Sequence, residues 1–346
     1  NTSQCGVDSR MYESLGEVVL KDGERVEAGV VACPDPAWAE RIEALLGHKG
    51  EIWRWQNRCC ARDELGLDAR YYLLHRDGDP FANMLTATYK GVGHFGHVFT
   101  IPEDRRKGAA HHLMGLLMED FRQRSGRALF LGTGFDSAPY HIYRRHGFEG
   151  LQPGSGQMEY YVDGDGGSFR EAYFATGDVE TGVPKWRHWP ASGALFTSTF
   201  DGVVRCPSLG LHGRNSTEAP FLEVLKRAQH DRENQHGIDT IVTERTDTGA
   251  VVAVARKSRH PLWSHRQLLD LYGHPEAQQE MSASVEALGS LDAGCVSYSD
   301  GNETREAVLS AAGFREISCL PQWVGAAKDE RTFVEVGADV GVWTKG

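Results

Sequence analysis

Six consecutive residues form the part of this sequence that most clearly predicts chemistry. Three cationic and three small residues follow one another: Arg105, Arg106, Lys107, Gly108, Ala109 and Ala110. A β-rich run at 98–100 precedes them, and an apolar helical pattern follows. Small residues at the entry to a helix leave backbone N–H groups unpaired at the positive end of the helix dipole. The segment therefore predicts an anion site suited to phosphates, with the three cations at its rim.

The sequence around this loop resembles the acetyl-CoA-binding core of the GCN5-related N-acetyltransferases (GNAT). The pyrophosphate loop of that family reads Gln/Arg-x-x-Gly-x-Gly/Ala, and Arg105, Gly108 and Ala110 occupy its three fixed positions. Pro102-Glu103 precedes the loop, as is usual in the family, and a tyrosine followed by Gly-Phe closes the region at 143–148. The resemblance covers residues 98–148.

The resemblance implies that acetyl-CoA is the co-substrate and that its pyrophosphate binds the amides of residues 105–110. It also implies that backbone amides near Phe99 and Thr100 polarise the acetyl carbonyl, because the fourth strand of the family separates from the fifth there. Asp136 stands where the family often has an asparagine that contacts the pantetheine arm, so its role is left open.

Tyr143 is the candidate general acid, because it matches the closing tyrosine of the family four residues before Gly147. A phenol with a pKa of ~10 is protonated at neutral pH and can donate a proton to a leaving thiolate. The alternative is a half-buried tyrosine that only packs beside its helix.

The candidate bases are two histidines. The strand before the loop lacks the glutamate that family members often use and has His94 and His97 instead. An imidazole with a pKa of ~6.5 can accept a proton from an ammonium substrate, which predicts a limb in kcat/KM at pH ~6–7.5. Alternatively both are surface residues of the strand, and the base is Glu51, Asp63 or Glu64.

Three aromatic residues, Trp53, Trp55 and Tyr89, are candidates to line the acceptor pocket. The segment between the first two helices covers the substrate in this family, and aromatic faces suit a cationic amine. Packing in a core or between domains is the alternative.

No metal is expected. His111 and His112 are adjacent on a helix, so their side chains point ~100° apart. No Cys or His partner stands at ligand spacing from them. We therefore expect both to be structural.

Composition restricts the classes of protein further. The 346 residues carry a net charge of −11, from 37 basic and 48 acidic side chains, whereas nucleic-acid binding needs a basic face. No apolar run approaches the ~20 residues that cross a bilayer, and residues 1–10 lack the apolar core of a signal peptide. Seven cysteines without CxxC pairs favour reduced thiols, so a cytoplasmic location is expected.

The periodicity predicts a mixed, mostly antiparallel α/β sheet flanked by helices. We expect strands at 26–33, 70–75, 81–89, 94–101, 128–132 and 157–162, and helices at 35–46, 108–124 and 137–146. Residues 51–65 predict a loop and a short helix. Residues 164–168 predict a linker or, alternatively, a hairpin turn.

The second half weakly repeats the first. Strand 295–298, helix 302–312 and the following Gly-Phe parallel strand 128–132, helix 137–146 and Gly-Phe, although Ala-Gly-Phe at a helix end can also recur by chance. On this alignment 250–255 is the strand before the loop, and 275–288 is the helix after it. The interval 256–274 lacks the loop pattern, and Leu309 replaces the tyrosine. We therefore expect two GNAT-like domains, residues 1–165 with the acetyl-CoA site and residues 166–346 as a degenerate copy.

The predicted activity is an acetyl-CoA-dependent N-acetyltransferase that acetylates a primary amine by direct attack in a ternary complex. The alternative is a non-catalytic acyl-CoA-binding or regulatory module. The expected acceptor is a small-molecule amine, with a protein or peptide amine as the second option. Neither nucleic acid nor a membrane is an expected partner, and oligomerisation is left open.

Overall fold

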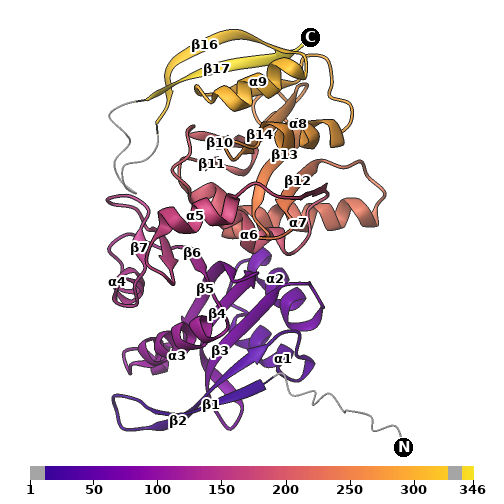
Figure 1. Cartoon of the computed structure of the whole chain (residues 1–346). Coiled ribbons are helices and arrows are strands. Elements are labelled where there is room, and N and C mark those ends of the chain that lie inside the picture. The colour runs from indigo at the N-terminus through magenta and orange to yellow at the C-terminus, as the bar shows by residue number, and fades with distance from the viewer. Residues whose placement is uncertain (1–11, 326–336) are drawn as a thin grey trace, which may run out of the picture. The chain divides into compact units, whose positions relative to one another are not determined.

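The computed structural model describes residues 12–325 and 337–346, which form two large sheets flanked by helices (Figure 1). The strands of the first sheet are β1 (Tyr12–Val19), β2 (Arg25–Ala32), β3 (Asp68–Arg76), β4 (Asp79–Tyr89), β5 (Val92–Thr100), β6 (Ala128–Gly132), β7 (Glu149–Gly150) and β8 (Gln157–Tyr161). They lie in the order β1-β2-β3-β4-β5-β6-β8-β7. Each predicted strand of this half is present within two residues of its expected ends, and β1 and β7 are additional.

Two-residue turns join β3 to β4 and β4 to β5. Asp77 and Gly78 have φ of 48° and 87°, and Lys90 and Gly91 have φ of 49° and 77°. Two successive left-handed residues make a type I′ turn, whose twist matches that of the flanking strands. These turns fix the register of the strands that lead to the predicted anion loop.

The helices of the first half are α1 (Pro36–Leu45), α2 (Glu51–Arg62), α3 (Ala109–Gln123) and α4 (Ala138–Arg145). Asp35 caps α1 by accepting a hydrogen bond from the Ala37 amide at 2.9 Å, and Ser137 caps α4. Helix α3 packs against β3 and buries one face: Ala109, Leu113, Met114, Leu117, Met118 and Phe121. Helix α2 occupies residues 51–62, so the helix in the segment 51–65 is longer than predicted, and only the end of the segment is a loop.

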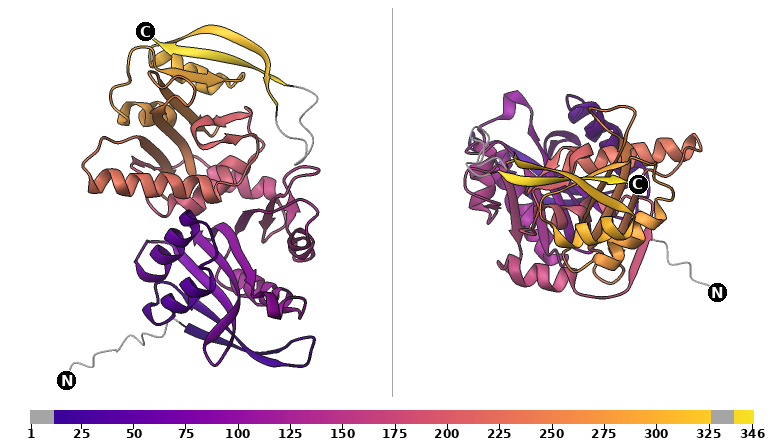
Figure 2. Two further views of the ribbon diagram at one scale, coloured as in Figure 1. Left: turned by 180° about the vertical axis from the view of Figure 1, so that it is seen from behind. Right: turned by 90° about the horizontal axis from the view of Figure 1, so that it is seen from above.

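The second sheet follows along residues 179–345. Its strands are β9 (Val179–Gly182), β12 (Thr240–Arg245), β13 (Val251–Arg259), β14 (Gln267–Gly273), β15 (Val296–Ser299), β16 (Phe314–Val324) and β17 (Ala338–Lys345). The helices around it are α5 (Gly166–Phe174), α6 (His188–Thr197), α7 (Glu218–Glu233), α8 (Gln278–Ala287) and α9 (Glu303–Ala311). A small separate pair consists of β10 (Val204–Cys206) and β11 (Leu211–His212). Figure 2 shows β16 and β17 side by side, as their antiparallel pairing requires.

Both sheets have the same strand order. From β9 the second sheet reads β9-β12-β13-β14-β15-β17-β16, which repeats the order of the first sheet from β2 onward. The parallel pair of each sheet lies at the equivalent place, β5 with β6 and β14 with β15. This shared topology supports the tandem arrangement, whereas the division at residues 165 and 166 stays a prediction.

The structure corrects two details of the predicted second half. The strand that precedes α8 is β14, not 250–255, which lies in β13 one strand earlier. The segment equivalent to the anion loop is therefore 274–277. Residues 164–168 do not form a hairpin, because Asp165 accepts a hydrogen bond from the Gly167 amide and caps α5, which begins at Gly166.

The chain divides into two compact units. Residues 12–87 and 95–124 form the first, and residues 88–94, 125–325 and 337–346 form the second. Strand β5 contributes its first three residues, Val92–His94, to the second unit, where they pair with β6. Within the second unit, α6 packs against both β6 and β13.

The described cysteines are free thiols: Cys33, Cys59, Cys60, Cys206, Cys295 and Cys319. Cys5 and residues 1–10 lie outside the described residues. In the described part of the chain, no helix combines the length and apolar character that crossing a bilayer requires.

Candidate functional site

The predicted anion loop connects β5 to α3 within the first unit. Arg106 and Gly108 are both left-handed, with φ of 66° and 97°, and Gly108 is the N-cap of α3. A Cβ added to Gly108 would meet nothing closer than Lys21 Cγ at 3.5 Å. The backbone conformation, and not a lack of space, therefore requires glycine here.

The loop presents a row of backbone donors. Among the described residues, none accepts a hydrogen bond from the amides of 106–110. The amides of His111 and His112 already bond to the Gly108 carbonyl, at 3.0 and 3.2 Å. Consecutive N–H groups around left-handed residues, at the positive end of a helix, form an anion-binding concavity. The loop is thus able to bind an anion.

The three predicted rim cations differ in how they are engaged. Lys107 binds Asp104 at 2.9 Å and Asp22 at 3.1 Å, and these hydrogen bonds raise its pKa. Arg105 donates from Nε to the Thr100 carbonyl at 3.1 Å. Arg106 is exposed, and the described residues provide it with no ion pair or side-chain hydrogen bond. Arg106 is therefore the cation most available to a bound anion, and Lys107 is committed to holding the loop.

A buried carboxylate anchors the start of the loop. Asp104 accepts two hydrogen bonds from Arg76, at 2.9 and 2.8 Å, and this contact holds the pKa of Asp104 at about 2. Arg76 also binds both oxygens of Glu24, at 2.6 and 2.8 Å. Sequence reasoning missed this network, because its members lie on separate elements and no motif links them.

Strand β5 changes its course before the loop. His97 is left-handed, with φ of 52°, and its carbonyl accepts a hydrogen bond from Asn83 Nδ2 at 2.9 Å. A left-handed residue inside a strand interrupts the regular ladder, as bulges beside active sites do. The pairing of β5 with β6 covers only Val92–His94. Phe99 and Thr100, the predicted amides for the acetyl group, follow in the half-buried end of β5.

His97 is buried in the first unit. Its Nε2 donates to Gln56 Oε1 at 2.6 Å, and its ring lies 5.2 Å edge-on from the ring of Trp53. Burial, reinforced by the charges of Lys49 and His48, lowers the pKa of His97 to about 3.

His94 is buried in the second unit. Its Nε2 bonds to the Trp189 carbonyl at 3.0 Å, and a Cβ added to Gly193 of α6 would lie 3.0 Å from its ring. Burial lowers the pKa of His94 to about 4. Neither strand histidine therefore has the pKa of ~6–7.5 predicted from the sequence, and neither is a surface residue.

Tyr143 is also buried in the second unit, where its ring lies 6.1 Å from that of Phe148. Burial, followed by the negative charge of Glu218, raises the pKa of Tyr143. The phenol therefore stays protonated at neutral pH, which is the state that a proton donor needs.

The remaining predicted residues are divided between the two units. Trp53 and Trp55 are half-buried on α2 of the first unit. Tyr89 belongs to the second unit and packs against Gly249, where an added Cβ would meet its ring at 2.7 Å, so its surroundings match the packing alternative. Asp136 is exposed, left-handed and paired with His141 at 2.9 Å.

Comparison with solved structures finds proteins that are similar to parts of this chain in fold. No protein-family profile and no curated protein sequence matches the chain. The GNAT domain of S. lividans PAT is 13% identical with a TM-score of 0.32, over 42% of this chain and 96% of that one. The ribosomal-protein-S5-alanine acetyltransferase of Vibrio fischeri is 12% identical with a TM-score of 0.31, over 50% and 94%. A GNAT-family acetyltransferase of Streptococcus pneumoniae is 12% identical with a TM-score of 0.32, over 49% and 100%.

Likenesses this distant say nothing about activity. The fold is GNAT-like on its own features, which are the strand order, the parallel pair that ends at His94, and the glycine-led entry to α3.

The lowered histidine pKa values predict a specific dependence of stability on pH. An unfolded imidazole has a pKa of ~6.5 and binds a proton below that pH. In the folded chain His94 and His97 stay unprotonated until the pH falls to their lowered pKa values. Unfolding free energy should therefore fall as pH decreases from ~6.5 toward ~4, by up to ~1.4 kcal/mol per pH unit for each histidine. Urea titrations at a series of pH values measure this slope. His97→Gln should reduce it, and exposed His265→Ala should not; an unchanged slope in His97→Gln contradicts the account.

Proposed function

We propose that this chain is an acetyl-CoA-dependent N-acetyltransferase whose pyrophosphate site is the row of amides at residues 106–110. The observation that carries the proposal is that these five amides lack an acceptor among the described residues while left-handed Gly108 opens α3. Exposed Arg106 supplies a charge-assisted contact at the rim. The Asp104–Arg76 contact and the ion pairs of Lys107 hold the backbone in this form before the anion arrives.

Acetyl-CoA supplies an activated acetyl thioester, and the acceptor is a primary amine. The amides near Phe99 and Thr100 are assigned to polarise the acetyl carbonyl. As the amine nitrogen bonds to the carbonyl carbon, the carbon–sulfur bond breaks and the thiolate leaves. Tyr143 donates its phenolic proton to that sulfur, because a phenol is protonated at neutral pH.

We do not assign the general base to either of the two histidines on β5. An imidazole with a pKa near 3 or 4 binds a proton too weakly to remove one efficiently from an alkylammonium group. The proton is then taken by ordered water or by one of the carboxylates of the α2 segment: Glu51, Asp63 or Glu64.

We assign one acetyl-CoA site to the chain. The segment equivalent to the loop in the second half is 274–277, which reads His-Pro-Glu-Ala. Pro275 has no N–H to donate, and Glu276 places a negative charge where a phosphate would bind. Ala277, the N-cap of α8, also lacks the left-handed conformation of Gly108.

The second candidate function is a non-catalytic acyl-CoA-binding module. The observation in its favour is that both strand histidines are buried and neutral, so β5 offers no ready base. Release of free thiol from acetyl-CoA over a panel of amines separates the two functions, because a binding module releases none above background.

Gly108→Asp should abolish acetyl-CoA binding. The substitution forces an L residue into φ of 97° and sets a carboxylate against the pyrophosphate, so Kd should rise by ~10²-fold or more. Isothermal calorimetry should show one site in the wild type and none in the variant. Gly115→Asp, on an exposed position of the same helix with open space around it, is the matched control and should bind normally. Equal affinity in Gly108→Asp would remove the loop from the site.

Tyr143→Phe should lower kcat by ~10²–10⁴-fold and leave the affinity for acetyl-CoA nearly unchanged, because only the proton donor is lost. Steady-state thiol release and calorimetry measure the two quantities. Tyr140→Phe, a buried tyrosine on the same helix, is the control that should keep its kcat. If Tyr143→Phe turns over at the wild-type rate, Tyr143 is not the acid.

A further inference from the structure

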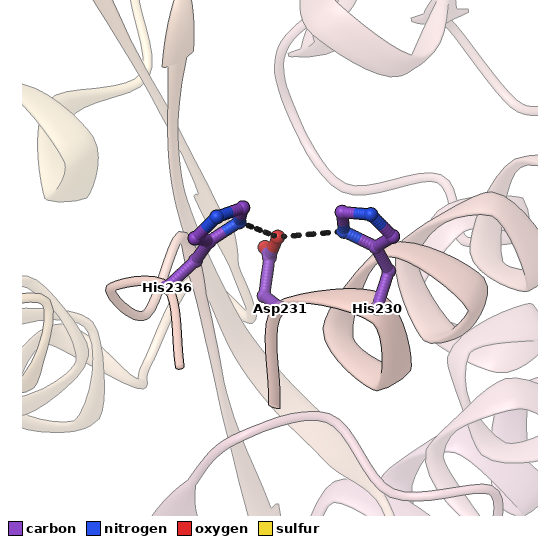
Figure 3. A group of neighbouring side chains, drawn as sticks. All are labelled: His230, Asp231 and His236. Carbon is purple, nitrogen blue, oxygen red and sulfur yellow. Dashed lines mark hydrogen bonds and ion pairs between the residues drawn. The ribbon is translucent and has the colours of Figure 1, made fainter. Parts of the chain in front are cut away.

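Two histidines and an aspartate gather at the C-terminal end of α7, away from the residues assigned to the acetyl-CoA site. One ligand atom from each of His230, Asp231 and His236 lies within 4.8 Å of the others. Figure 3 shows both imidazole rings turned toward the same carboxylate. The two histidine side chains are 64% and 59% exposed, and that of Asp231 is 15% exposed. The cluster is therefore open to solvent and anchored by its central residue.

The backbone conformation after α7 explains why His236 lies beside the last turn of the helix. Gln235 is left-handed, with φ of 56°, and the His236 amide donates to the Asp231 carbonyl at 2.8 Å. The Gln235 amide donates to the Arg232 carbonyl at 3.3 Å, which completes a Schellman motif. This closure fixes His236 beside Asp231, and side-chain amide Nδ2 of Asn234 holds the His230 carbonyl at 2.8 Å.

Two of the three spacings between the ligand atoms match the edges of a tetrahedral metal site, and the third is within 4.8 Å. Asp231 Oδ1 lies 3.5 Å from His230 Nδ1 and 3.4 Å from His236 Nδ1. Bonds of ~2.0–2.2 Å to zinc at tetrahedral angles place neighbouring ligand atoms ~3.3–3.6 Å apart. Good hydrogen bonds between nitrogen and oxygen are shorter, at ~2.7–3.2 Å. The two contacts therefore have the length of the edges of a metal site.

The surroundings also favour a cation. The C-terminal end of a helix carries partial negative charge, and the carboxylate of Asp231 adds to it. Arg227 Nε lies 3.9 Å from the other oxygen of Asp231, Oδ2, and its main partner is Asp239 at 2.8 Å. Arg227 therefore approaches the oxygen of Asp231 that does not contact the rings, and it leaves Oδ1 to the two histidines.

We propose that His230, Asp231 and His236 bind one Zn²⁺ ion, with water in the fourth position. Imidazole nitrogen and carboxylate oxygen are ligands that zinc accepts, and three protein ligands leave one position open. Bound zinc would tie the turn after α7 to the last turn of the helix. The proposal does not depend on the acetyltransferase activity. It also revises the expectation of no metal, which considered only the adjacent pair His111 and His112.

The test uses the full chain without an affinity tag and titrates it with ZnCl₂ in a calorimeter. We expect one zinc per chain, with Kd raised more than ~10-fold in each of three single variants: His230→Ala, Asp231→Asn and His236→Ala. His265→Ala, which removes an exposed histidine from the segment between β13 and β14, is the matched control and should bind as the wild type does. Melting in the presence of a chelator should be the same for all these proteins.

Substitution with Co²⁺ adds a readout that needs no variant. A tetrahedral site should give the wild-type protein the strong visible absorption of four-coordinate Co²⁺, and zinc should remove it by competition. Absence of zinc binding, binding that survives in all three variants, or only the weak absorption of hydrated Co²⁺ would each overturn the proposal.

Discussion

The pairing of β5 with β6 ends after three residues, and the candidate site depends on that constraint. Val92–His94 form a parallel ladder with Ala128–Phe130, and no ladder pairs the rest of β5 with β6. Beyond this point His97 is left-handed, the strand ends at Thr100, and a short 3₁₀ turn at Pro102–Asp104 leads into the loop. A strand paired along its whole length would have its amides satisfied by a neighbour. The early end of the ladder therefore frees this segment to serve a ligand.

Charge neutralisation inside the first unit keeps the loop in shape. Asp104 is buried yet ionised, because Arg76 and Lys107 pair with it, and Arg76 in turn holds Glu24. A buried carboxylate without such partners would be costly, so the network and the turn depend on each other. Side chains on β3 and in the β1–β2 turn therefore hold the amides of residues 106–110 in place. These amides do not donate hydrogen bonds within helix α3.

Capping and turn residues act locally, and they made most of the helices and strands predictable from the sequence. Contacts between residues far apart in the sequence were not predictable in this way. Asp35 before Pro36, the Lys90-Gly91 turn and Gly108 each act within a few residues, so their elements appear within two positions of expectation. The burial of His94 under α6 depends on Gly193, which is 99 positions away in the chain. Long-range burial of this kind decides the histidine pKa values, and no spacing rule reveals it. The group of His230, Asp231 and His236 was missed because a Schellman turn, not helical periodicity, brings His236 to Asp231.

The central claim is that the amides of residues 106–110 bind the pyrophosphate of acetyl-CoA, and a crystal structure of the full chain with acetyl-CoA tests it most directly. The account predicts pyrophosphate oxygens within ~2.7–3.2 Å of these amide nitrogens, Arg106 turned toward the anion, and no ligand at 274–277. Pyrophosphate bound elsewhere, with the amides of 106–110 facing only water, would contradict it.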